Sequence, residues 1–595
     1  MERALGAIQH RGPNARGIHL DPKGQFALGH VRLSVIDVSA ASNQPFWSAC
    51  GRYVLIYNGE IYNYLEIRKE LEREGVAFRT TSDTEVLLQA MIRWGVEAIN
   101  KFNGMWAFVF GDVYSGAFVT SRDRWGVKPL FTMHQDGMMI LCSEAKGIFA
   151  WLGTTPQPNH CAVGRYLKYG AGGESAESWF DGVERFPPTM HQTIQLNSLN
   201  ASTHSMGSYW NYPVHRTIHN FDDAIGRIEE LLTDAVSIRL RSDVPIGLSL
   251  SAGVDSGAIA WIVGEKLNRK LEAYTAWHQP VNKSQLPVAQ EIARRYGHQS
   301  TSVDETDQDN TTRDLRTCIH SLEAAHSSPA IIPYLNLCRA ARSSLTVMLE
   351  GQGADELLGG YQEFSLFASL DHLMRGNLHG FAQCLAAYAH NYGWQSAALD
   401  CVRFSNRAVY THQAHRWNAK GLLGSEVLEA VPEHFRTLRW SRSNFSDALH
   451  HWHRFNLTNL LQYGDAISMS VNLETRCPFL DYRLVEFGFS LGTELLMNRS
   501  YGKYLLRKCA EAHLPKPTCW SRKKDGFSNS TTRMITKFVE QWGLPSDGVE
   551  LAMDLGILKS PLRSKDTFLR LPPNIQFRTY SLLQWLEVFY GRDKR

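Results

Sequence analysis

The sequence predicts an α+β N-terminal domain followed by an α/β domain, in three successive parts: a β-rich part, an α/β part with a parallel sheet, and a mostly helical part. Up to about residue 200, short strand-like segments meet Gly, Asn or Asp turn signals. Beyond a stretch at 198–207 that is rich in Ser, Asn and Thr, apolar strands alternate with helices, as in parallel sheets with helical crossovers. From about residue 360 the pattern is mostly helical.

In the first part, strands and helices alternate over short distances. Strands are expected in YVLIYNG (53–59), MWAFVFGD (105–112) and GAFVTSRD (116–123), because β-branched and aromatic residues run up to turn residues in each. Two helices are expected between these strands, from Tyr64 to Glu74 and from Asp83 to Trp94.

The second part begins with a helix, because Asn220 followed by Asp223 is typical of a helix start. Ile225, Ile228 and Leu232 then fall on one helical face. The strands that follow are IGLSL (246–250), LEAYTAW (271–277) and SLTVMLEG (344–351). We therefore expect a first domain over 1–200, a linker over 201–219 and a second domain over 220–595.

The composition is that of an ordinary globular protein and speaks against two kinds of partner. The hydrophobic share is 44%, the charged share 20% and the formal net charge +3. No basic run indicates nucleic acid, and no apolar run approaches the roughly 18 residues of a membrane span.

The ten cysteines form no C-x-x-C pair, so zinc and a disulfide framework are not indicated. Reduced thiols in the cytoplasm are expected, since the N-terminus also lacks a signal-peptide core.

The hexapeptide SAGVDS (251–256) lies where a buried strand gives way to a helix that begins near Asp255. At such a junction, unpaired N–H groups and the helix dipole face an anion. Gly253 permits close approach of the backbone, and Ser251 and Ser256 offer hydroxyl groups. Asp255 fits a phosphate only if Mg²⁺ lies between the two. The alternative is a plain turn with capping residues, and no G-x-x-x-x-G-K-[ST] loop occurs in the chain.

A second glycine-rich loop, EGQGADELLGGY (350–361), follows the strand SLTVML. Asp355 and Glu356 give it a second carboxylate cluster. Because ligands of open α/β sheets bind at the carboxyl ends of the strands, the two loops are expected to border one crevice. The pair of loops favours phosphate binding over a flexible acidic turn.

The ordered motifs of the chain resemble those of asparagine synthetases of the glutamine-hydrolysing type, over essentially its whole length. The two loops are similar to that family's SGGxDS and GxGADExxGGY signatures, and other matches lie in its helical signature and its lysine-bearing C-terminal loop. These are NLLQYGDAISMSVNLETRCPFLD (459–481), YGKYLLRKCAEAHLP (501–515) and RKKDGF (522–527). Matches to the glutaminase domain are HRGP (10–13), RLSVID (32–37), NGEIYN (58–63), TSDTE (81–85) and RDRWGVKPL (122–130).

The resemblance implies an N-terminal-nucleophile (Ntn) type β-sandwich covered by helices, followed by an ATP-pyrophosphatase-like parallel-sheet domain with a helical C-terminal part. It implies that the second domain activates aspartate with MgATP as an aspartyl-adenylate, which ammonia then converts to asparagine. Asp255 and Asp355 would bind magnesium, and Lys503 and Gln352 would stand at catalytic positions. The positions that would bind ATP or pyrophosphate are Leu250, Ser251, Gly253, Asp255, Ser256, Ala276, Glu350 and Gly351.

For the first domain, the resemblance implies release of ammonia from glutamine. Arg32 would clamp the substrate's α-carboxylate and Asp83 would pair with its α-ammonium group. Asn58 and Gly59 would donate to the oxyanion of the tetrahedral intermediate. Glu60 would extend the substrate pocket. An intramolecular channel is expected to carry ammonia between the domains.

The chain departs from the family at the expected nucleophile. The family's glutaminase uses an N-terminal cysteine whose own α-amine serves as the base. Here residue 2 is Glu, HRGP begins at residue 10, and the first cysteine is Cys50. We therefore expect that the first strand and the nucleophile are missing, through a start codon assigned at an internal Met or in a genuinely ammonia-dependent enzyme. Loss of the strand would leave an unpaired sheet edge.

Three smaller departures bear on activity. Ala252 adds a methyl group where the family's loop carries Gly, Gln352 stands where some members carry Glu and β-lactam-forming relatives carry Tyr, and Ala466 stands where many carry Arg.

An asparagine synthetase is the first interpretation, with aspartate, ATP, Mg²⁺ and either glutamine or ammonia as its ligands. The alternatives are an amidotransferase or β-lactam-type cyclase for another carboxylic acid, and an inactive nucleotide-binding homologue. The oligomeric state stays open, with a homodimer as one alternative.

Overall fold

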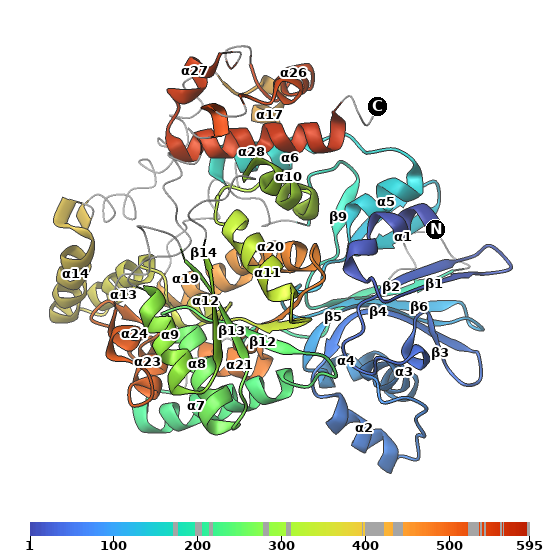
Figure 1. The fold of residues 1–595 in the computed structure, drawn as a ribbon, viewed down its shortest axis with the longest axis horizontal. Helices are drawn as coiled ribbons and strands as arrows, with labels where there is room; N and C mark the ends of the chain where they lie inside the picture. The colour runs from blue at the N-terminus through green and yellow to red at the C-terminus, as the bar shows by residue number, and fades with distance from the viewer. Residues whose placement is uncertain are drawn as a thin grey trace.

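The computed structural model places two sheet regions side by side and a helical end piece beside them (Figure 1). The residues that the structure describes are 1–170, 176–196, 205–213, 218–277, 285–304, 311–395, 397–398, 422–431, 444–521, 535, 538–540, 543–559, 562 and 564–591. In this part of the chain, no helix is long and apolar enough to cross a membrane.

The N-terminal region holds an antiparallel sheet of the order β11-β10-β6-β5-β4-β3. Its strands are β3 (Phe46–Trp47), β4 (Tyr53–Ile61), β5 (Gly104–Asp112), β6 (Ala117–Arg122), β10 (Met190–Gln195) and β11 (Ser205–Ser208). The three strands expected from the sequence are therefore present as β4, β5 and β6. The stretch predicted as linker contributes β11, which pairs with β10, whereas residues 201–204 and 214–217 of that stretch lie outside the described residues.

A second β layer packs on one face of this sheet and consists of two separate pieces. The pieces are β1 (Ala15–Leu20) with β2 (Ala27–Arg32), and β7 (Phe131–Gln135) with β8 (Met138–Cys142) and β9 (Val183–Arg185). Leu28 on β2 and Leu141 on β8 meet the same apolar cluster, which includes Val54 and Phe118 of the large sheet. The two layers therefore form a sandwich.

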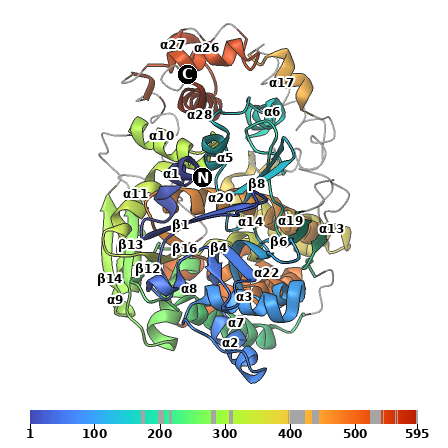
Figure 2. The ribbon, with the colours of Figure 1, turned by 90° about the vertical axis from the view of Figure 1, so that its right-hand side faces the viewer.

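Helices cover both outer faces of the sandwich. Ile67 and Leu71 pack with Leu87 and Met91 against the large sheet on the face away from the second layer. On the other side, α1 and α5 lie together against the second layer (Figure 2). The helices of this region are α1 (Glu2–Ala7), α2 (Tyr64–Arg73), α3 (Asp83–Trp94), α4 (Ala98–Lys101), α5 (Ala145–Leu152) and α6 (His160–Tyr169). Both helices expected from the sequence are present, α2 ending one residue early.

The second region is built on a parallel sheet of the order β14-β13-β12-β15-β16, as its alternating pattern predicts. The strands are β12 (Ile246–Ser249), β13 (Glu272–Trp277), β14 (Gln299–Asp304), β15 (Val347–Leu349) and β16 (Glu474–Arg476). The helices interleaved with them are α7 (Phe221–Arg239), α8 (Val254–Trp261), α9 (Gln285–Arg295), α10 (Thr311–Leu322), α11 (Ile331–Arg342) and α12 (Ala354–Leu358). Asn220 caps α7, its side chain accepting from the N–H groups of Asp222 and Asp223.

The rest of the chain is mainly helical, and α26, α27 and α28 lie together at one end of the molecule in both views (Figures 1 and 2). A short hairpin, β17 (Met497–Asn498) with β18 (Tyr501–Gly502), precedes α23. The helices described are α13 (Glu363–Met374), α14 (Leu378–Tyr392), α17 (Ser425–Ala430), α19 (Phe445–His451), α20 (Leu457–Met469), α21 (Tyr482–Ser490), α22 (Thr493–Leu496), α23 (Tyr504–Ala510), α24 (Lys516–Trp520), α26 (Ser546–Asp554), α27 (Lys565–Leu569) and α28 (Pro573–Tyr590).

Candidate functional site

The SAGVDS loop leaves the carboxyl end of β12 and enters α8 at Val254. Its two hydroxyl groups shape the turn: Ser256 Oγ accepts from the N–H of Ser251 at 3.0 Å, and the two Oγ atoms lie 3.0 Å apart. The N–H of Gly253 donates to Ser251 Oγ at 3.2 Å. Ser251 is exposed and Ser256 buried, so the loop presents hydroxyl and N–H groups at a helix start.

The acidic loop lies directly beside SAGVDS because β12 and β15 are neighbours in the sheet. A Cβ on Gly351 would lie 2.9 Å from Asp255 Cβ and 3.1 Å from the backbone nitrogen of Ser256. Only glycine permits this approach without displacing backbone. The expectation that the two loops border one crevice thus has a structural basis in adjacent parallel strands.

Lys503 contacts one carboxylate of each loop. Its Nζ lies 2.6 Å from Asp255 Oδ2 and 2.6 Å from Asp355 Oδ1, and the side chain is buried. The residue has a φ of 56° and stands immediately before α23. A Cβ on Gly360 would meet Asp355 Oδ1 at 2.0 Å and Lys503 Cε at 2.1 Å, so this glycine leaves room for the ion pair.

The two carboxylates also fit the magnesium site that the sequence predicts. Within the described ranges, no group of three or more His, Cys, Asp or Glu is arranged to hold a metal. Mg²⁺ is usually held by one or two carboxylates together with substrate phosphates, so two are sufficient. Asp255 Oδ1 is buried and accepts no hydrogen bond from the described residues, which leaves one oxygen for such a ligand.

The other positions expected near the nucleotide surround the same strand ends. Leu250 is buried and donates its N–H to the carbonyl of Tyr274 on β13, while Ala276 lies two residues further along that strand. Glu350 is buried, and its Oε1 accepts from the Tyr334 hydroxyl at 2.8 Å. Burial raises the pKa of Glu350 to about 7. Gln352 and Glu350 line one small cavity with Tyr334.

A second pocket lies between the N-terminal sandwich and the parallel-sheet region and has a volume of about 100 Å³. It contains every residue expected to bind glutamine: Arg32, Asn58, Gly59, Glu60 and Asp83. Asn58 Nδ2 is buried and donates to no acceptor in the described part of the chain. Gly59 has a φ of 155°, and a Cβ there would lie 2.0 Å from the carbonyl of Met105.

The charged residues of this pocket have partners within the protein. Arg32 donates to the carbonyls of Ser39 and Ile36 and to Asn43 Oδ1, so the guanidinium is held by its own following loop. Asp83 Oδ2 accepts from the Tyr57 hydroxyl and from the Ile61 N–H, and burial raises its pKa to about 6.

Glu60 faces the second domain. Its Oε2 lies 3.3 Å from Nη2 of Arg476 on β16, and Glu474 on the same strand lines the pocket. Burial, followed by the nearby Glu474 carboxylate, raises the pKa of Glu60 well above its ordinary value. No cysteine is among the residues that line this pocket in the described part of the chain.

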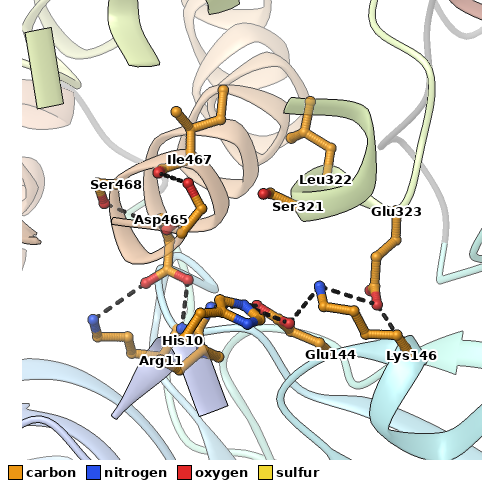
Figure 3. Close-up of polar contacts among 12 residues, drawn as sticks. His10, Arg11, Glu144, Lys146, Ser321, Leu322, Glu323, Asp465, Ile467 and Ser468 are labelled. Atoms are coloured by element: carbon orange, nitrogen blue, oxygen red, sulfur yellow. Dashed lines mark hydrogen bonds and ion pairs between the residues drawn. The ribbon is translucent and has the colours of Figure 1, made fainter. Parts of the chain in front are cut away.

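Sequence reasoning missed a buried ion-pair network that joins the two regions (Figure 3). Arg11 lies 3.0 Å from Glu144 Oε1 and 2.7 Å from Asp465 Oδ2 on α20. Lys146 pairs with Glu144 at 2.5 Å and lies 3.7 Å from Glu323. Arg11 belongs to the motif HRGP (10–13) and Asp465 to the helical signature at 459–481, but these two motifs alone do not indicate that the residues are in contact. The RKKDGF motif (522–527) lies outside the described residues.

Two protein-family models match successive parts of the chain. Residues 1–210 match the family model of a glutamine amidotransferase domain, and residues 227–546 match that of asparagine synthase. Glutamine-hydrolysing asparagine synthetase 3 of Bacillus subtilis is 27% identical over 569 residues, covering 91% of this chain and 86% of its own. Asparagine synthetase 1 of that organism is 29% identical over 559 residues, covering 90% and 84%.

Two further proteins are similar to this chain: one relative carries a different kind of name, and one solved structure is only weakly similar. Amidase chry2 of Gibberella zeae is 28% identical over 540 residues, covering 82% of this chain and 78% of its own. A solved B. subtilis glutamine phosphoribosylpyrophosphate amidotransferase is 17% identical, covers 47% of this chain and 64% of its own, and has a TM-score of 0.26, too low to support a fold argument. The family models decide the assignment: the chain belongs to the asparagine synthase family, with a glutamine amidotransferase domain ahead of its synthase domain.

Proposed function

We propose that this chain makes asparagine from aspartate and ATP through an aspartyl-adenylate, releasing AMP and pyrophosphate. The observation that carries the proposal is the meeting of Asp255, Asp355 and Lys503 where the two glycine-rich loops leave the parallel sheet. Two carboxylates and a buried ammonium group lie beside loops whose backbone N–H groups can donate to phosphate. Such a group of residues can bind a nucleoside triphosphate. The membership of the asparagine synthase family supports the choice of acid.

In the adenylation step, the side-chain carboxylate of aspartate attacks the α-phosphorus of ATP and the bond to pyrophosphate breaks. The hydroxyl groups of Ser251 and Ser256 and the N–H of Gly253 would hold the leaving pyrophosphate. Lys503 bridges two carboxylates at 2.6 Å, and phosphate oxygens would compete for its ammonium group as their charge develops. Mg²⁺, held by Asp255 and Asp355, would neutralise phosphate charge.

The nucleotide base and ribose would lie along Leu250, Ala276, Glu350 and Gly351, at the ends of β12, β13 and β15. Buried Leu250 offers an apolar contact, and Gly351 allows close approach. The place of these residues at neighbouring strand ends supports this assignment, because ligands of parallel sheets bind there.

We also propose that the second pocket binds glutamine, with Asp83 and Arg32 holding its α-amino and α-carboxylate groups. The unpartnered Nδ2 of Asn58 and the N–H of Gly59 would donate to the oxyanion. Because no cysteine among the described residues lines this pocket, we propose that this chain takes its nitrogen from ammonia.

Isotope exchange between labelled pyrophosphate and ATP tests the adenylation site. Exchange that depends on aspartate is expected, and Lys503→Gln is expected to reduce it by about 10²–10³-fold, as for loss of one preorganised charge donor. Lys508→Gln, five residues along on α23 and paired with exposed Glu511, is the matched control and should leave it unchanged. Exchange with a different carboxylic acid would replace aspartate in the proposal, and ATP binding without exchange would contradict it.

A further inference from the structure

A small cavity lies where the acidic loop, α11 and α20 meet Val127 of the N-terminal domain. Its volume is about 20 Å³, enough for one molecule of the size of water or ammonia. Among the groups lining it are Tyr334, Glu350, Gln352, Asp465, Thr475 and Cys477. The cavity therefore joins the end of β15, where the adenylate would form, to a residue of the amidotransferase domain.

Glu350 is the carboxyl group held at the start of the acidic loop. Its N–H donates to the carbonyl of Arg476 at 2.9 Å, and its Oε1 accepts from Tyr334 at 2.8 Å, which fixes both ends of the residue. The ion pairs of the described residues include none with Glu350. Burial without a cation raises the pKa of this carboxyl to about 7, so both protonation states are accessible near neutral pH.

The other titratable groups that line the cavity do not change protonation state near neutral pH. Asp465 pairs with Arg11 at 2.7 Å and Lys128 at 3.2 Å, and these charges hold its pKa below the ordinary value despite burial. Burial raises the pKa of the Cys477 thiol and of the Tyr334 hydroxyl, so neither ionises near neutral pH. Gln352 carries an amide, which takes up no proton at neutral pH.

Attack of ammonia on an aspartyl-adenylate requires such a group. The nitrogen bonds to the carbonyl carbon, and the resulting ammonium centre must lose a proton before the carbonyl re-forms and the bond to AMP breaks. Without a proton acceptor, the intermediate returns to ammonia and adenylate. An acceptor that is a carboxylate near neutral pH and lies beside the reacting carbon meets this requirement.

We propose that Glu350, rather than the neighbouring Gln352, accepts the proton from the attacking ammonia. The proposal rests on the proposed function, since it concerns the second half-reaction at the same site. One proton moves from nitrogen to a Glu350 carboxylate oxygen, asparagine and AMP leave, and the proton then passes to solvent. Glu350 is thereby assigned a part in amide formation instead of only a place along the nucleotide.

The test separates the two half-reactions in Glu350→Gln and Gln352→Ala. Glu350→Gln is expected to lower ammonium-dependent asparagine synthesis by about 10²–10⁴-fold, the usual range for a general base. Because Glu350 also lies along the nucleotide, aspartate-dependent pyrophosphate exchange should fall as well, but at least about tenfold less than synthesis. Gln352→Ala should lose less than about tenfold of synthesis. Hydroxylamine, which sheds its proton more readily than ammonia, should restore product formation in Glu350→Gln.

The pH profile at a constant concentration of free ammonia provides a second readout, because the acidic limb of synthesis near pH 7 should then vanish in Glu350→Gln. Titratable side chains facing Glu350 from the surrounding elements are Tyr334, Cys338, Tyr463, Asp465 and Cys477. Equal loss of exchange and synthesis in Glu350→Gln would overturn the inference and return Glu350 to a nucleotide-binding role. Full synthesis in this variant would overturn it as well. Absence of exchange in the unsubstituted chain would instead overturn the proposed function.

Discussion

The ammonium group of Lys503 lies 2.6 Å from Asp255 Oδ2, joining residues that stand 248 positions apart in the sequence. The same nitrogen lies 2.6 Å from Asp355 Oδ1 on the acidic loop. All three side chains are largely buried, and Lys503 supplies a compensating positive charge to both carboxylates. The group thus ties together α8, α12 and the start of α23.

Removing Lys503 should destabilise the synthase domain. Lys503→Met removes the buried ammonium group that contacts both carboxylates and should lower the free energy of unfolding by about 3–5 kcal/mol. Adding Asp255→Asn to this variant should recover part of the loss, because one uncompensated charge is removed. Denaturant unfolding checks both. Lys508→Met, whose partner Glu511 is more exposed, should cost about 0.5 kcal/mol or less. Equal losses at positions 503 and 508 would contradict the buried ion pair.

Gly59 should not tolerate a side chain. Its φ of 155° favours glycine, and a Cβ would lie 2.0 Å from the carbonyl of Met105 on β5. Gly59→Ala should therefore lower the free energy of unfolding by about 2–3 kcal/mol, through strain and overpacking. Gly75→Ala is the control, because Gly75 has a φ of 85° but no atom within 4 Å of an added Cβ. It should cost only about 1–2 kcal/mol, and a Gly59→Ala loss no greater than this would contradict the contact geometry.

Arg11 should couple the unfolding of the two domains. It lies 3.0 Å from Glu144 and 2.7 Å from Asp465, and all three side chains are buried (Figure 3). Arg11→Met should cost about 3 kcal/mol, the lower end of the range for a broken buried ion pair, because Lys146 and Lys128 still contact the two carboxylates. Calorimetry should then show the two domains melting further apart. Arg16→Met removes a contact with exposed Glu2 and should change the profile little; matching profiles for the two variants would argue against a structural role for Arg11.

Glu350 should make stability fall as the pH rises. Because its pKa is raised from 4.5 to about 7, the folded state binds the proton more tightly than the unfolded state between these values. This carboxyl therefore contributes stability below pH 4.5 that is lost as the pH rises through about 7, with a slope of about 1.4 kcal/mol per pH unit. Glu350→Gln should lack this contribution, so its stability relative to the unsubstituted chain should improve between pH 5 and 7. Parallel pH curves would contradict the assignment.

Much of the local structure followed from the sequence, because periodic patterns and caps are local. The helix expected from Asp83 to Trp94 is α3 at the same residues, and Asn220 caps α7 as its spacing with Asp223 indicates. The strand β11 was not predicted, because Ser205–Ser208 has little strand propensity of its own and gains its hydrogen bonds from β10. The domain boundaries stay a prediction.

The part of the site that lies at the ends of neighbouring strands could be predicted from the sequence. Adjacent parallel strands bring Asp255 and Asp355 together, and that adjacency could be expected from an alternating α/β pattern. The contacts of Arg11 could not, because Asp465 stands 454 positions away and no local pattern records the pairing. Nor does the sequence show that Glu350 is buried, which is what raises its pKa. The roles of these residues in binding and catalysis stay predictions.

The central claim is tested most directly by product analysis of the purified chain with MgATP, aspartate and either ammonium or glutamine as the nitrogen source. We expect asparagine and pyrophosphate in equal amounts from ammonium, and neither asparagine above background nor glutamate from glutamine. Product from ammonium alone would support the synthase site together with the proposed nitrogen source. Failure to form asparagine or pyrophosphate from either source would contradict the claim that this chain is an aspartate-amidating enzyme.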